Sequence, residues 1–178
     1  LHHYSLREDQ REILGQVTEY ARQLHPDVIL IAGDVYDKSV PSAEAVRLWD
    51  EFLTGLSVIS PRIPILIISG NHDSAQRLDY ASRILGRQNI YISGEAPREK
   101  DEYLKKVTLS DEYGEVDFYL LPFVKPGYVR KLFDEEIKGY DMAVRRLIER
   151  EEIDPARRCV ILSHQFYTAG GKEPATWR

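Results

Sequence analysis

The chain has 178 residues, of which 43% are apolar and 30% are charged, and its formal net charge is -5. This composition is that of an ordinary globular domain rather than a disordered chain, and no apolar run approaches the roughly 20 residues that span a bilayer. The negative charge argues against non-specific electrostatic binding of nucleic acid over a broad surface. We therefore expect a single domain over residues 1–178 with one sizeable core.

The cysteine content and the ends of the chain give two further expectations. The lone cysteine, Cys159, cannot form an internal disulfide, and no secretory signal segment is visible, so a cytoplasmic setting is expected. The first residue is Leu1, the single methionine is Met142, and the last residues are "ATWR". These features predict a piece of a longer protein.

The first half of the chain alternates between helical and extended patterns. Apolar residues three or four apart predict a helix over 6–24, and the same spacing predicts another over 42–56. Consecutive apolar residues at 28–31 and 65–68 predict strands, the first covered on both faces. This order indicates parallel strands joined by right-handed crossovers, with helices covering the sheet.

The second half predicts a mixed sheet. We expect a helix over 74–85 capped by Ser74, a strand over 89–93, and a hairpin whose turn at 111–114 places Gly114 at a positive φ. A final buried strand is expected in "CVILSH", which contains Cys159. Before it, a helix is expected with one apolar face made of Tyr140, Ala143, Val144, Leu147 and Ile148.

Polar side chains follow three of the expected strands. Asp34 follows the first, Asn71 and His72 follow the second, and His164 follows the last. Ligands bind beyond the carboxyl ends of parallel strands, so these side chains are expected to converge. A carboxylate, an amide oxygen and an imidazole suit manganese, iron or zinc better than calcium. A carboxylate can also bridge two ions about 3.5 to 4 Å apart, which bind a phosphodiester without a basic patch.

Each residue also has a structural interpretation. Asp34 can be a helix cap or a turn residue, Asn71 and His72 can form an ordinary turn, and His164 can be a structural histidine at a strand end. A metal site is favoured because all three positions fall at the same end of their strands.

Three segments resemble motifs of the calcineurin-like metallophosphoesterases: "GDVYD" at 33–37, "GNHD" at 70–73 and "SHQF" at 163–166. The flanking segments "LHHYSLREDQREIL" and "YLLPFVKPGYVRKLF" are similar to the SbcD family of nuclease subunits from bacterial SbcCD complexes. The resemblance implies a layered α/β/β/α sandwich with mixed sheets. It also implies two divalent metal ions, with manganese as the expected metal.

The same resemblance implies a role for each matching residue. Asp34 would bridge both metals, and Asn71 and His164 would ligate the second metal. His72 would not be a ligand but would stabilise the transition state or assist the leaving oxygen, and Asp37 would orient it by a hydrogen bond.

Two family motifs, Asp-x-His and Gly-His-x-His, are expected outside residues 1–178, so a polypeptide with these termini is expected to be inactive alone. His2 and His3 match the family stretch. The alternatives for these two residues are a role as metal ligands, an exposed position in solvent, or a position that faces DNA. Positive charges that can contact a DNA backbone, or simply form a solvated face, are Lys125, Arg130 and Lys131.

The resemblance finally implies a function. We expect exonuclease and endonuclease hydrolysis of DNA, an ATP-hydrolysing SbcC-type partner and a dimer of the nuclease subunit. No Gly-rich ATP-binding loop is present in the sequence, in agreement with an ATPase on a separate chain. The alternatives are a phosphoesterase of small phosphodiesters or phosphomonoesters, and a DNA-binding or ATPase-binding scaffold with a degenerate metal site.

Overall fold

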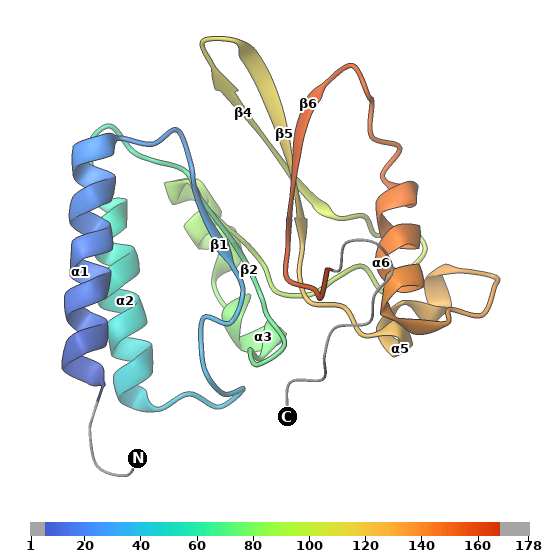
Figure 1. The fold of residues 1–178 in the computed structure, drawn as a ribbon, viewed down its shortest axis with the longest axis horizontal. Coiled ribbons are helices and arrows are strands. Elements are labelled where there is room, and N and C mark those ends of the chain that lie inside the picture. The colour runs from blue at the N-terminus through green and yellow to red at the C-terminus, as the bar shows by residue number, and fades with distance from the viewer. Residues whose placement is uncertain (1–5, 168–178) are drawn as a thin grey trace.

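A computed structural model describes residues 6–167, which form two three-stranded sheets (Figure 1). The first sheet has the order β1-β2-β3 and is parallel throughout. In the second sheet, β4 is antiparallel to β5, and β5 is parallel to β6. The strands are β1 (Ile29–Ala32), β2 (Ile65–Ile68), β3 (Ile90–Ser93), β4 (Lys105–Asp111), β5 (Gly114–Leu121) and β6 (Arg158–Ser163).

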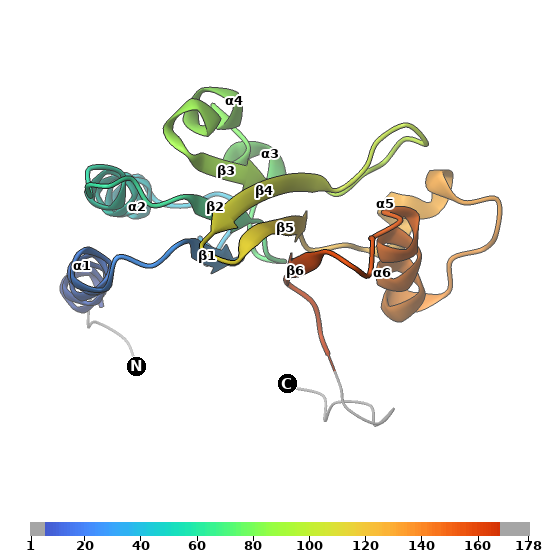
Figure 2. The same cartoon turned by 90° about the horizontal axis from the view of Figure 1, so that it is seen from above.

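Helices cover the outer faces of both sheets, so the layers follow the order α/β/β/α (Figure 2). Helices α1 (Arg7–Leu24) and α2 (Ala43–Ser57) lie against the first sheet, and α6 (Gly139–Arg150) lies against the second. The Ser42 hydroxyl accepts a hydrogen bond from the Ala45 amide at 3.2 Å, which caps α2. The layered fold predicted from the sequence is confirmed.

Successive side chains of β2 point to opposite faces of its sheet and so fill both layers of the core. Ile65 and Ile67 pack toward α1 and α2, whereas Leu66 and Ile68 pack toward the second sheet. All of β2 is buried because it is the central strand of its sheet and is covered on both faces. The cluster between the sheets also contains Val107, Phe118, Leu120 and Leu162, and a third cluster joins β5 to α6.

The hairpin prediction is confirmed. Asp111 pairs with Gly114 across the turn between β4 and β5, and Gly114 has a φ of +112°. Two short elements follow β5: helix α5 (Pro126–Val129) and the 3₁₀ turn η2 (Arg130–Leu132). In residues 6–167, no helix is both long enough and apolar enough to cross a membrane.

The prediction of one helix over 74–85 is wrong. This segment forms two single turns, α3 (Ala75–Leu78) and α4 (Ser82–Leu85), followed by the 3₁₀ turn η1 (Gly86–Gln88). Ala81 lies between the two turns at a φ of 60°, which interrupts the helical hydrogen bonds, and Ser74 makes no side-chain cap. Tyr80 and Ile84 in this segment are exposed.

The expected burial of β1 and β6 is also wrong. Intermediate and exposed residues alternate along β1, and the first half of β6 is exposed, including Cys159. Among the described residues, each strand is the outer strand of its sheet, and the two contact each other along one side of the sandwich (Figure 2). Apolar runs show that a segment is a strand but do not show whether it lies at an edge.

Candidate metal centre

The candidate site residues converge at one edge of the sandwich. Strands β1, β2 and β6 all end at this edge, which is the lower edge in Figure 1. Asp34 follows β1, Asn71 and His72 follow β2, and His164 follows β6 directly. The structure therefore brings together residues from both sheets, as their positions in the sequence predicted.

Two oxygen donors lie close to one nitrogen donor at this edge. The His164 Nε2 is 3.1 Å from the Asn71 Oδ1 and 3.5 Å from the Asp34 Oδ2. Ligands bound about 2.1 Å from one ion are separated by about 3.0 to 3.4 Å in octahedral or tetrahedral geometry. The spacing of the three atoms therefore fits a shared divalent cation.

The imidazole of His164 is oriented by the chain that precedes Asp34. Its Nδ1 lies 2.6 Å from the carbonyl oxygen of Ala32, which can only accept a hydrogen bond. A proton on Nδ1 would be donated to this carbonyl and would leave the lone pair of Nε2 available for a metal ion between His164, Asn71 and Asp34. The ring also packs edge-on against Phe123, with 6.3 Å between ring centroids.

Asp34 has an unusual backbone conformation. Its φ of 49° lies in the left-handed region, which costs a residue with a side chain free energy unless surrounding contacts compensate. The Oδ1 atom accepts a hydrogen bond from the His72 amide at 3.0 Å, and Oδ2 faces His164. One carboxylate thus links the loop after β2 to the residue after β6.

Gly33 and Gly70 allow the two loops to approach. A Cβ on Gly33, whose φ is +90°, would lie 2.8 Å from the Gly70 Cα and 2.5 Å from the His164 Nδ1. A Cβ on Gly70 would overlap the backbone and carboxylate of Asp34. Both positions therefore require glycine for steric reasons.

Asp73 is a positioning residue that the sequence analysis did not identify. Its Oδ2 accepts hydrogen bonds from the amides of Gly70 at 2.8 Å and Val35 at 3.1 Å, and its Oδ1 accepts one from Tyr36 at 2.9 Å. The Gly70 contact, three residues away, is a recognisable turn pattern. The contacts to Val35 and Tyr36 had no signal in the sequence because they join different loops.

His72 is held by Asp37, but through the main chain. The Nδ1 of His72 lies 3.0 Å from the carbonyl oxygen of Asp37. This hydrogen bond raises the pKa of the imidazole above its ordinary value, and the negative charge of Asp34 adds to the effect. This shift stabilises the protonated form relative to a free imidazole, a direction that suits an exposed group that delivers a proton.

The donor set fits part of a metal centre. Within residues 6–167, no three or more His, Cys, Asp or Glu side chains are grouped to hold a metal ion. At this site, Asp34 and His164 are the two groups of those types, and the amide oxygen of Asn71 is the third donor. A nitrogen ligand with two oxygen ligands matches Mn²⁺, Fe²⁺ or Zn²⁺ better than Ca²⁺.

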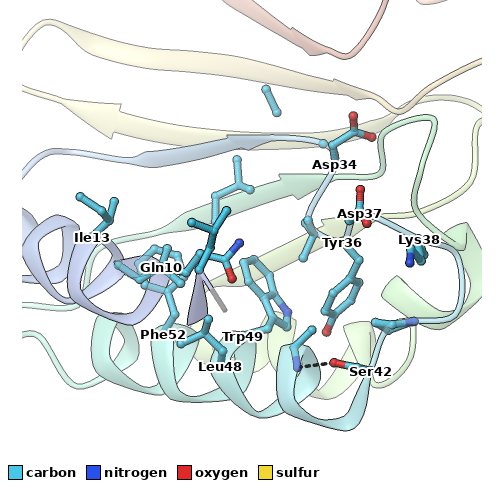
Figure 3. A pocket seen from close by; sticks show the side chains of 18 of the residues that line it. Gln10, Ile13, Asp34, Tyr36, Asp37, Lys38, Ser42, Leu48, Trp49 and Phe52 are labelled. Atoms are coloured by element: carbon cyan, nitrogen blue, oxygen red, sulfur yellow. Dashed lines mark hydrogen bonds between the residues drawn. The ribbon is translucent and has the colours of Figure 1, made fainter. Parts of the chain in front are cut away.

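A cavity of about 1030 Å³ lies beside this centre, between α1, α2 and the segment after β1 (Figure 3). Asp34 and Asp37 line it, whereas Asn71 and His164 do not. Tyr36 and Trp49 pack edge to face in its wall, with ring centroids 6.4 Å apart. Burial raises the pKa of Tyr36, and the carboxylate of Asp73 adds to this shift.

Other predicted residues lie away from these donors. His2 and His3 are outside the described residues. Lys131 lies 3.6 Å from a carboxylate oxygen of Glu99, and Lys125 and Arg130 are exposed in the segment after β5.

Comparison with known proteins identifies related sequences. The family model for calcineurin-like phosphoesterase matches residues 1–173. Two similar curated proteins are named as SbcD subunits of the nuclease SbcCD: one from Staphylococcus epidermidis is 35% identical over 170 residues, and one from Staphylococcus saprophyticus is 34% identical over 169 residues. These alignments cover 94% and 93% of this chain, but 43% of each relative. The chain thus spans less than half the length of the relatives it matches.

Proposed function

Because this chain belongs to the calcineurin-like phosphoesterase family, we propose that the protein hydrolyses DNA phosphodiester bonds with two divalent metal ions. Mn²⁺ is the expected metal. The observation that carries the proposal is the convergence of Asp34, Asn71 and His164, with donor atoms 3.1 and 3.5 Å apart. The relatives named as subunits of a nuclease support DNA as the substrate. A cytoplasmic setting stays a prediction.

The three donors would hold the ions as follows. Asn71 and His164 would ligate one ion through the Oδ1 and Nε2 atoms that face each other, and Asp34 would bridge to the second ion. The remaining ligands would come from residues other than these three. When bound, such a pair of ions polarises the phosphate and supplies the attacking hydroxide.

His72 would act on the leaving group. Its imidazole is exposed, its orientation is set by the carbonyl oxygen of Asp37, and its pKa is raised by that hydrogen bond. A ring that carries a proton can donate it to the leaving oxygen or stabilise the negative charge of the transition state. Because Asp37 acts through its carbonyl, its side chain would be less important for this orientation than its backbone position.

We further propose that the protein acts with an SbcC-type ATPase, as a dimer of the nuclease subunit, in exonuclease and endonuclease reactions. The relatives are named as one subunit of SbcCD, which supports assembly with a second type of subunit. Two alternatives remain distinct in their chemistry: a phosphoesterase of small esters, and a scaffold that binds DNA or the ATPase without catalysis.

The test uses the full-length protein loaded with Mn²⁺. We expect it to degrade linear DNA and to hydrolyse bis(p-nitrophenyl) phosphate. Hydrolysis of the small ester without any degradation of DNA would favour the small-substrate alternative. A metal-loaded protein that hydrolyses neither substrate would favour the scaffold.

Two variants separate the proposed roles within the same experiment. His72→Ala is expected to retain its metal content and to lower turnover by about 10²- to 10⁴-fold, because it removes a proton donor. Asn71→Ala is expected to lower metal occupancy, because it removes a ligand. Equal metal loss in both variants, measured by elemental analysis, would contradict the role of His72.

A further inference from the structure

Two cationic side chains lie against the ring of Tyr128, in the segment that follows Phe123, whose ring packs against His164. The Arg98 Cζ is 5.0 Å from the ring centroid, and the Lys125 Nζ is 6.0 Å from it. Tyr128 is 44% exposed, and both cations are at the surface. We call Arg98, Lys125 and Tyr128 the cation platform. A cation held against an aromatic face stays accessible to an anion while losing little further mobility.

The segment that carries Lys125 and Tyr128 is fixed to the core. The Tyr128 amide donates a hydrogen bond to the Lys125 carbonyl at 2.9 Å, which closes a turn between them. Val124 and Val129, on either side, are fully buried in the cluster beneath α6. The part of the platform that carries Lys125 and Tyr128 is therefore anchored to the core, whereas Arg98 lies in the irregular segment after β3.

Ser69 connects the platform to the candidate metal centre. The carbonyl of this buried residue accepts a hydrogen bond from the Phe123 amide at 3.0 Å. Its hydroxyl donates to the Gly94 carbonyl at 2.6 Å, which anchors the segment that leads to Arg98. The next residues after Ser69 are Gly70 and Asn71. The segments that carry Arg98 and Lys125 are thus both hydrogen-bonded to Ser69 at the end of β2, two residues before the candidate metal ligand Asn71.

The platform keeps positive charge available. One nitrogen of Arg98 pairs with Glu95 at 3.0 Å, which leaves other guanidinium N–H groups to donate. Lys125, like the nearby Arg130, makes no ion pair with any carboxylate in residues 6–167. On a protein with a net charge of -5, the ammonium group of Lys125 and the remaining N–H groups of Arg98 can therefore contact an anion.

We propose that the cation platform binds backbone phosphates of a DNA strand whose scissile phosphate lies at the candidate metal centre. This inference rests on the proposed function. It concerns the backbone phosphates beside the scissile phosphate, which a small ester lacks. Fixed positive charge positions a strand without reading its sequence. Nucleic acid is favoured over a protein partner because two cations lie against the Tyr128 ring, which makes the ring less suited to act as an apolar anchor.

The test measures DNA binding by the full-length protein without cleavage. Lys125→Met and Arg98→Met are compared with wild type by anisotropy of a fluorescent single-stranded oligonucleotide in EDTA, over a range of salt concentrations. Each lost phosphate contact is expected to reduce the slope of log K against log salt by about 0.7, which corresponds to about a fivefold loss of affinity near 0.1 M salt. Lys125→Arg is expected to bind like wild type.

Arg22→Met is the matched control. Arg22 is an exposed arginine in the last turn of α1, at the opposite end of the strands, where it pairs with Glu19. Removal of its charge is expected to leave DNA affinity unchanged. With Mn²⁺, the platform variants are also expected to hydrolyse bis(p-nitrophenyl) phosphate at the wild-type rate while their KM for DNA rises about fivefold.

The possible results separate the two proposals. Platform variants that bind DNA like wild type would overturn the inference, and degradation of DNA by the wild type would leave the proposed function in place. Loss of ATPase binding with unchanged DNA binding would overturn the inference in favour of a protein contact. A wild-type protein that neither binds nor degrades DNA would overturn both.

Discussion

At the scale of single residues, Asp73 connects the two loops that carry Asp34 and Asn71. Its carboxylate accepts three main-chain hydrogen bonds, one from Gly70 in its own loop and two from the residues that follow Asp34. A carboxylate is suited to this task because both of its oxygens only accept. Asp73 therefore holds the two loops together without being a candidate ligand itself.

Asp73→Asn is expected to weaken this connection. An amide offers one acceptor oxygen, so at least one of the three N–H groups loses its partner, and the free energy of unfolding is expected to fall by about 1 to 3 kcal/mol. Mn²⁺ affinity is expected to fall as well, because Asp34 and Asn71 are no longer held in register. Urea denaturation and calorimetric metal titration of the full-length protein would measure the two effects.

The control for this change is Asp27→Asn, which alters an exposed aspartate before β1. It is expected to change neither quantity. An Asp73 variant with wild-type stability and wild-type metal affinity would show that the loops are held together by other contacts.

The sequence predicted that the candidate site residues would converge, but not the details of how they meet. Asp34, Asn71 and His164 were recognisable because each polar residue interrupts the end of an apolar run. The left-handed φ of Asp34 and the approach of Gly33 to Gly70 were not predictable, because they depend on how separate loops meet. The same reason explains why the partner of His72 is a carbonyl oxygen.

At the scale of secondary-structure elements, prediction succeeded where the periodic pattern was long. Helices α1, α2 and α6 and the β4–β5 hairpin were expected close to their observed positions. The break between α3 and α4 was missed because it arises from the backbone conformation of Ala81, an ordinary helix-forming residue. Short patterns do not separate one helix of three turns from two single turns.

The hairpin is joined to β6 by a buried carboxylate. Asp117 on β5 is 2% exposed and contacts the Arg157 Nε at 2.6 Å, the Thr108 hydroxyl at 2.6 Å and the Lys106 Nζ at 3.0 Å. The Arg157 guanidinium, with Thr108 and Lys106, holds the pKa of Asp117 well below its usual range. The ionised form is thus favoured in the folded protein.

This shift predicts how stability depends on pH. A folded-state pKa below the unfolded value near 3.9 stabilises the protein above that pH, and the contribution is lost as the pH falls toward the folded value. Asp117→Asn is expected to lower the melting temperature by several degrees at pH 7. The difference from wild type is expected to shrink between about pH 5 and pH 2.

Thermal unfolding at several pH values would measure this difference, with Asp101→Asn as the control at an exposed position. A constant difference between wild type and the Asp117 variant from pH 7 to pH 2 would contradict the assignment to ionisation. It would indicate that the hydrogen-bonding shape of the side chain, rather than its charge, is what matters.

At the scale of the whole molecule, the candidate metal centre is assembled from two sheets. Asp34 and Asn71 follow strands of the first sheet, and His164 follows a strand of the second. The sheets are held together by the apolar layer that contains Leu120. The position of His164 relative to Asn71 therefore depends on packing between the sheets.

Leu120→Ala and Leu121→Ala form a matched pair that tests this dependence. Both residues are fully buried, but Leu120 packs between the sheets and Leu121 packs beneath α6. Each substitution is expected to lower the free energy of unfolding by about 2 to 5 kcal/mol. Only Leu120→Ala is expected also to weaken Mn²⁺ binding, measured by calorimetry at a temperature where both variants are folded. Equal weakening in both would contradict the dependence.

The layered architecture followed from the family resemblance, and strand order alone would not have predicted it. The apolar runs did not distinguish the central β2, which is buried along its length, from β1 and β6, which are outer strands among the described residues. Burial of a strand depends on its neighbours, and a single sequence does not name them.

The contact between Gly33 and Gly70 has a consequence for how the site can be tuned. Because the two loops touch backbone to backbone, the closest approach of the main chains that carry Asp34 and Asn71 is set by main-chain dimensions. Substitutions at neighbouring positions can alter charge or hydration there, but no side chain acts as an adjustable spacer. To accommodate a larger ion at this site, one of the two loops would have to be lengthened, because exchange of a single residue would not move the loops apart.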